Sequence, residues 1–132
     1  MPENSEKFRH PGELRALAHF QSLGYEIVSH NFHAGFAEID LIVRDLEGTI
    51  HFIEVKAYAG ETHPLETFTK QKTSRMKRAA GRFLSEQSER EGQSSVTFGL
   101  AWVKENEIVY YPGLYVQFRL HGSTDGNSVT GK

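Results

Sequence analysis

The sequence predicts an α/β protein in which a mixed central β-sheet is flanked by helices, with the elements in the order αβββαββ. Two observations lead to this expectation. Five short runs are rich in Ile, Val, Phe and Tyr and lie between turn residues, as strands do, and two longer segments repeat apolar residues at helical spacing. Their succession favours a sheet with a helix on each side. A length of 132 residues suits one domain.

The first half of the chain contains one helix and three strands. Pro11-Gly12 opens a helical segment that is expected to run to Leu23 and to end at Gly24. Three strands and a loop are expected to follow, at 25–28, 37–44, 49–56 and 59–68, and the turn at 45–48 makes the second and third strands an antiparallel hairpin.

The second half begins with a long helix, expected over 69–90. Its apolar residues follow the spacing i, i+3, i+4, i+7, i+8, which forms one buried stripe: Met76, Ala79, Ala80, Phe83 and Leu84. Polar residues end this helix, and two more strands are expected at 96–103 and 108–111, joined by a turn at 104–107.

Composition restricts the classes of protein that the chain can represent. It has no Cys, which excludes a disulfide scaffold, a Cys-ligated zinc site and a thiol nucleophile. It begins without an apolar signal segment and has no apolar run of membrane-spanning length, so a soluble cytoplasmic protein is expected. The polar ends, 1–9 and 121–132, are expected to be flexible tails of a domain over 10–120.

Three charged residues on the predicted central strands form the candidate site. Asp40 lies within an otherwise apolar strand, and Glu54 and Lys56 share one face of the next strand, about 7 Å apart along it. Two carboxylates on adjacent strands can hold Mg²⁺ or Mn²⁺, and the lysine can orient an attacking water or neutralise charge that develops on a phosphate. A partly exposed Asp at a strand end and a Glu–Lys surface pair would explain the same pattern without function.

Glu13 adds a third candidate acid. It shares one side of the first predicted helix with Leu17 and Phe20, so it can face the sheet. The other interpretation is a first-turn Glu that is favoured by the helix dipole.

The second predicted helix carries a cluster of cations in its first half, although the whole chain has a net charge of −2. A phosphate-binding patch and an ordinary solvated face are both open interpretations. Lys72 differs from the others because it falls within the apolar stripe and should point toward the sheet. The candidate nucleic-acid contacts are Lys70, Lys72, Arg75, Arg78 and Arg82.

The seven histidines give weaker signals. His30 and His33 have metal-ligand spacing, but no other ligand pattern accompanies them. Surface or turn positions are expected for all seven.

Several of these residues together resemble a known family. Gly12-Glu13, Gly24-Tyr25, the run from Ala37 to Ile42, the run from Phe52 to Lys56 and Lys72 are similar to the YraN-like family of bacterial endonuclease-like proteins. That family is similar to Holliday-junction resolvases and belongs to the PD-(D/E)XK nuclease superfamily. The resemblance covers roughly residues 10–116.

The resemblance implies a restriction-endonuclease-like sandwich, a Mg²⁺ or Mn²⁺ site and DNA as the substrate class. It assigns catalytic roles to Asp40, Glu54, Lys56 and Glu13, with Asp40 and Glu54 as the metal ligands. The chain departs from the family at three positions, where it has Ala37 instead of Gly, Tyr58 instead of a basic residue, and Gly99 instead of Asp.

The predicted function is therefore a metal-dependent DNA endonuclease. A DNA-binding or scaffolding protein with this fold and little catalysis is the alternative, and a protein-interaction module with structural carboxylates is a third hypothesis. The sequence leaves open whether the DNA is branched and whether the protein forms a homodimer.

Overall fold

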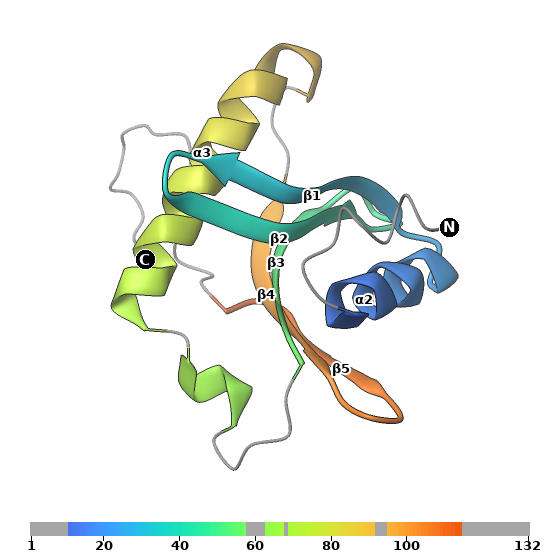
Figure 1. Ribbon diagram of the computed structural model, residues 1–132. Coiled ribbons are helices and arrows are strands. Elements are labelled where there is room, and N and C mark those ends of the chain that lie inside the picture. The colour runs from blue at the N-terminus through green and yellow to red at the C-terminus, as the bar shows by residue number, and fades with distance from the viewer. Residues whose placement is uncertain (1–10, 58–62, 68, 92–94, 115–132) are drawn as a thin grey trace.

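The computed structural model describes residues 11–57, 63–67, 69–91 and 95–114. Over these residues two α-helices and a short 3₁₀ helix accompany a five-stranded sheet (Figure 1). The elements, in chain order, are α2 (Pro11–Ser22), β1 (Glu26–Ala34), β2 (Ala37–Arg44), β3 (Ile50–Lys56), η1 (Pro64–Thr67), α3 (Lys70–Glu91), β4 (Val96–Val103) and β5 (Ile108–Tyr111). The predicted α/β class is confirmed, whereas the tails predicted at 1–9 and 121–132 lie outside the described residues.

The sheet is mixed, as the sequence predicted. Its strands lie in the order β1-β2-β3-β4-β5, and all neighbouring pairs are antiparallel except β3 and β4, which are parallel. Parallel neighbours need a long crossover, which η1 and α3 provide. No helix in the described part of the chain is both long enough and apolar enough to cross a membrane.

The two helices cover opposite faces of the sheet, as the alternation along β3 shows. Ile50 and Phe52 pack with the apolar stripe of α3, whereas Ile53 and Val55 pack with Ala16 and Phe20 of α2. Figure 1 shows α3 and α2 on either side of the strands. Each helix thus buries one apolar stripe against one face of the sheet.

The first strand is much longer than predicted. The expected strand at 25–28 continues to Ala34 and pairs with β2 along its length. The sequence did not predict this extension because apolar and polar residues do not alternate regularly after Val28. In the structure, Asn31 has a positive φ of 52° that interrupts the regular strand. Hydrogen bonds from β2, rather than local propensity, therefore define this half of β1.

The loop predicted at 59–68 contains one short helical turn, η1, in its described part. The helix that follows begins one residue after Thr69, whose Oγ1 accepts the Lys72 N–H at 3.1 Å. Thr69 is thus the N-cap of α3, and it fixes the position of Lys72 in the first turn.

Gly99 of β4 lies where no side chain fits. A Cβ built at this position would lie 2.5 Å from Cε1 and 2.7 Å from Cζ of Tyr110, which belongs to the neighbouring strand β5. Where the resemblance implied an Asp, the chain thus has a glycine, and the Tyr110 ring fills the space beside it.

Gly99→Ala should lower the free energy of unfolding by about 1–3 kcal/mol, because the tightly packed Tyr110 ring must move. Gly81→Ala in α3 is the matched control, since a Cβ there meets nothing within 4 Å, and it should raise stability by about 0.5–1 kcal/mol through helix propensity. Urea unfolding of both variants measures the difference, and equal stability of the two would contradict the packing argument.

Candidate functional site

Asp40 lies at the point where β2 and β3 stop pairing. The Cα partners of these strands run from Arg44 and Ile50 to Leu41 and Ile53, and Asp40 is the next residue of β2. Its Oδ2 accepts the backbone N–H of Val55 at 2.8 Å, and the residue is only 7% exposed. A side-chain carboxylate thus accepts the hydrogen bond that a strand backbone usually accepts, which places a buried acid in the middle of the sheet.

Glu54 holds two lysines at the same end of β3. Its Oε2 lies 2.8 Å from Nζ of Lys72 and 3.4 Å from Nζ of Lys56. All three side chains are only partly exposed. The prediction that Lys72 points toward the sheet is confirmed, and its partner is the carboxylate of the E-x-K motif.

Glu13, the third candidate acid, lies on α2. It is 3% exposed on the inner side of the helix, next to Gly12 and in line with Ala16 and Phe20. Its negative charge, like that of Glu38, acts on Asp40. The charges of Glu13 on α2 and Glu54 on β3 therefore both act on Asp40 of β2.

The electrostatics of the site reflect this crowding. Burial, followed by the negative charge of Glu54, raises the pKa of Asp40 to about 8, despite the hydrogen bond from Val55. Burial and the neighbouring Lys72 lower the pKa of Lys56. Burial alone would lower the pKa of Lys72 as well, but the hydrogen bond and the charge of Glu54 outweigh it and raise that pKa. The two lysines thus differ in how firmly they hold their protons.

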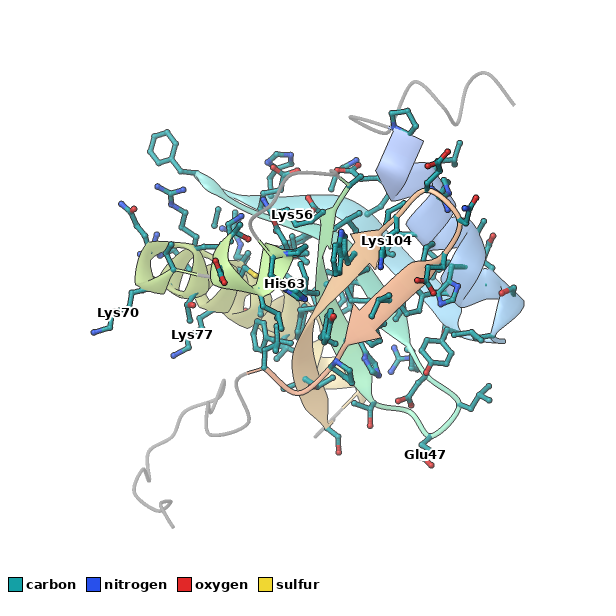
Figure 2. All side chains as sticks on the ribbon, turned by 90° about the horizontal axis from the view of Figure 1, so that it is seen from below. Glu47, Lys56, His63, Lys70, Lys77 and Lys104 are labelled. Carbon is teal, nitrogen blue, oxygen red and sulfur yellow. The ribbon has the colours of Figure 1, made fainter. Side chains whose placement is uncertain are left out.

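The other cations of α3 lie apart from this site. Arg75, Arg78 and Arg82 are exposed, as is Lys70, and Arg82 pairs with Glu86 of its own helix at 3.2 Å. Figure 2 shows Lys70 and Lys77 projecting from the outer side of α3, away from the sheet. Among the five predicted nucleic-acid contacts, the structure brings only Lys72 to the carboxylates.

Sequence reasoning was wrong about one histidine. His51, expected at a surface or turn position, is buried at 6% exposure on the α2 side of β3. Its Nε2 lies 2.9 Å from Oδ2 of Asp45 and its Nδ1 lies 2.7 Å from the Tyr110 hydroxyl. The partners come from a turn and from β5, and a lone His in a strand gives no local sign of them.

Asp45 and Tyr110 respond in opposite ways to this network. Burial would raise the pKa of Asp45, but hydrogen bonds from His51, Thr49 and Glu47 outweigh it and lower the pKa. Burial raises the pKa of Tyr110, and the charges of Tyr25 and Asp45 add to the effect. The network satisfies buried polar groups and ties β5 to the β2–β3 turn, which is a structural role.

The donor set at Asp40 and Glu54 fits a hard divalent cation. Mg²⁺ usually takes one or two protein carboxylates and keeps several waters. Within the described ranges, no three His, Asp or Glu side chains group closely enough to enclose a metal ion. Burial and the negative charge of Glu54 raise the pKa of Asp40, and a divalent cation bound beside the two carboxylates would favour the ionised form of Asp40.

Comparison with known proteins identifies the family. The model of the family described as "Uncharacterised protein family UPF0102" matches residues 12–103. The chain belongs to the UPF0102 family. These residues include Glu13, Asp40, Glu54, Lys56 and Lys72, so every element of the carboxylate–lysine cluster lies within the UPF0102 region. The resemblance to the YraN-like group is thereby confirmed.

Individual UPF0102 proteins agree with this assignment. The chain is 38% identical over 92 residues to the UPF0102 protein of Corynebacterium efficiens, covering 69% of this chain and 75% of the relative. It is 38% identical over 96 residues to the UPF0102 protein of Deinococcus radiodurans, covering 69% and 78%. The UPF0102 protein of Oleidesulfovibrio alaskensis is 45% identical over 76 residues, which cover 56% of this chain and 37% of that longer relative. The names state membership of the family and no activity.

The pKa of Asp40 predicts how stability varies with pH when metal is removed with EDTA. A folded-state pKa of about 8, above the ordinary aspartate value of 3.8, means that the folded protein binds this proton more tightly than the unfolded chain. Stability should therefore fall as pH rises from about 4 to about 8. Asp40→Asn keeps an acceptor for the Val55 N–H, so it should be more stable than wild type at pH 9 by an amount on the order of a few kcal/mol.

Urea unfolding at several pH values checks this prediction. Asp45→Asn is the control, because the pKa of Asp45 is lowered in the folded state. Its contribution to stability therefore has the opposite pH dependence, being present at neutral pH and lost in acid. If the unfolding free energies of wild type and Asp40→Asn vary with pH in the same way, the pKa of the Asp40 carboxyl is not raised in the folded state.

Proposed function

We propose that the protein is a divalent-metal-dependent DNA endonuclease with a restriction-endonuclease-like fold. The observation that carries the proposal is the cluster in which a buried Asp40 lies where two strands part, beside a Glu54 that two lysines contact. One acid and two lysines with shifted pKa values gathered at one point are a property of functional sites more than of structural ion pairs. All residues of this cluster lie within the region, residues 12–103, that matches the UPF0102 family.

Asp40 and Glu54 are the residues that would hold Mg²⁺ or Mn²⁺. When bound, such an ion supplies positive charge that polarises a phosphate and stabilises the negative charge that develops on it during hydrolysis. Glu13 is buried at the edge of the site and its charge acts on Asp40, so its proposed role is to adjust the affinity of the acid pair for a cation.

The two lysines have separate proposed tasks. Lys56, whose pKa is lowered by burial and by Lys72, is the better group to orient the attacking water and to exchange a proton with it. Lys72 keeps its charge because Glu54 stabilises it, so it is suited to bind a phosphate oxygen and to hold Glu54 in place.

The first half of α3 supplies the proposed contacts with the DNA backbone. Its exposed arginines lie on the same helix that delivers Lys72 to the site. Phosphate contacts of this kind provide affinity and position without reading sequence. The DNA would then lie along α3 with one phosphate at the carboxylates.

A DNA-binding or scaffolding role with little catalysis remains the second candidate. The observation that favours it is at Gly99, where the family's acid is absent and the Tyr110 ring occupies its space. Tyr58, the other departure that bears on this choice, lies outside the described residues.

Catalysis and binding separate in two variants of the same strand. Glu54→Gln keeps the shape and removes a charged ligand, so Mn²⁺ affinity and cleavage should both fall. Lys56→Met keeps the aliphatic stem and removes the ammonium, so Mn²⁺ and DNA should still bind while cleavage falls by about 10²-fold or more. Calorimetric Mn²⁺ titration and cleavage of duplex, single-stranded, flap and four-way DNA measure both effects.

If wild-type protein binds Mn²⁺ and DNA but cleaves no substrate faster than Lys56→Met does, the endonuclease proposal is wrong and the DNA-binding or scaffolding role replaces it. The absence of any specific Mn²⁺ binding would remove both roles and favour a protein-interaction module with structural carboxylates.

The proposed DNA path predicts a change in salt dependence. Neutralising Arg75, Arg78 and Arg82 to Gln together should weaken DNA binding and reduce the slope of log affinity against log salt by up to ~0.9 per lost phosphate contact. Arg44→Gln is the control, because Arg44 pairs with Glu26 at the other end of β2 from Asp40. Fluorescence anisotropy at several salt concentrations measures the slope, and an unchanged slope in the triple variant would show that this face is merely solvated.

A further inference from the structure

Three aromatic rings from different elements meet beside the proposed site. The His63 ring, which precedes η1, lies 4.7 Å from the ring of Trp102 in β4 and 5.6 Å from the ring of Tyr111 in β5, measured between centroids. All three residues are partly exposed. We call them the aromatic cluster.

Strand register places the aromatic cluster next to the E-x-K motif. Trp102 is the ladder partner of Lys56, and Leu100 is the partner of both Glu54 and Tyr111. Partners in neighbouring strands point to the same face of a sheet. The aromatic cluster therefore lies on the same face as Glu54 and Lys56, and Figure 2 shows Lys56, His63 and Lys104 in one region, away from Glu47.

Hydrogen bonds fix the geometry of the aromatic cluster. The Leu65 N–H donates to Nδ1 of His63 at 3.1 Å, which assigns the proton of the neutral ring to Nε2. That Nε2–H then donates to the Tyr111 hydroxyl at 3.3 Å. The rings of His63 and Tyr111 are thus oriented before any ligand binds, which lowers the entropic cost of binding.

A cation covers the ring of Trp102. Nζ of Lys104 lies 4.6 Å from the centre of this ring, and it also pairs with Glu107 at 3.5 Å. The Lys104 side chain is 40% exposed, so it can leave the ring at little cost. An aromatic ring with a partly exposed cation beside it is a combination with which proteins bind a nucleotide, since the base stacks on the ring and the cation contacts the phosphate.

We propose that Trp102 is the stacking subsite for an unpaired base of the DNA substrate, with Lys104 moving from the ring to a neighbouring phosphate. The inference rests on the proposed endonuclease function and specifies its substrate class. A base can reach Trp102 only when it is released from a duplex, so the substrate is DNA with unpaired nucleotides beside the cleaved phosphate, as in an overhang, a flap or a junction. Stacking of this kind tolerates any base sequence.

The single tryptophan of the chain makes the test direct, because all tryptophan fluorescence comes from Trp102. Wild-type protein in EDTA, which prevents cleavage, is titrated with single-stranded oligo-dT and with a duplex whose two ends are closed by non-nucleotide linkers, so that it has neither free ends nor unpaired bases. Anisotropy of a dye on the DNA reports binding independently. We expect oligo-dT to quench the tryptophan in parallel with binding, and the closed duplex to bind with little quenching.

Variants separate stacking from a purely structural role. Trp102→Ala should weaken binding of oligo-dT on the order of ten-fold and leave the closed duplex nearly unchanged. Trp102→Phe keeps a ring and should retain most of the affinity for oligo-dT, which preserves the test if the alanine variant does not fold. Phe36→Ala is the matched control, since Phe36 is an aromatic residue with 99% exposure on the β1–β2 turn, and it should affect both DNA forms equally or not at all.

Each contrary result has a distinct meaning. Three results would overturn the stacking subsite and leave the endonuclease proposal in place. They are binding of oligo-dT without quenching, equal quenching by both DNA forms, and an equal loss of affinity for both DNA forms in Trp102→Ala. No binding of either DNA form by anisotropy would overturn the DNA-directed function, and the subsite with it.

Discussion

The buried carboxylate of Asp40 is the constraint on which the site depends. It accepts the Val55 N–H where the ladder between β2 and β3 ends, so an ionisable group replaces an ordinary backbone acceptor. A carboxylate in this position is costly to ionise without a cation nearby. Both the proximity of Glu54 and the raised pKa of Asp40 follow from where the strands part, and they make the site receptive to a divalent ion.

The crossover between the parallel strands supplies the compensating charge. Thr69 caps α3 and fixes Lys72 in its first turn, from which its ammonium reaches Glu54. The same crossover carries His63 and η1 across β4, where His63 packs on Trp102. One connection thus delivers a cation to the acids and completes the aromatic cluster. Function and stability are in tension here, because the crowded charges serve chemistry better than they serve folding.

The other face of the sheet uses its polar groups differently. Asp45, His51 and Tyr110 form a hydrogen-bonded chain on the α2 side, and the Tyr110 ring also fills the space above Gly99. Every member of this chain has a protein partner, so the network holds β5 against the sheet. The alternation along β3 separates the two roles, since His51 points to one face and Glu54 and Lys56 to the other.

The sequence by itself determined the secondary structure of most elements, because the apolar spacing of α3 and the dense apolar runs of β2 and β4 are local signals. It also singled out Asp40, Glu54, Lys56 and Glu13, since charges within apolar elements are conspicuous. The length of β1, the burial of His51 and the meeting of Trp102 with His63 were decided only by the tertiary structure. Each depends on partners far away in the chain, and strand pairing and ring packing between such partners have no period that a single segment can show.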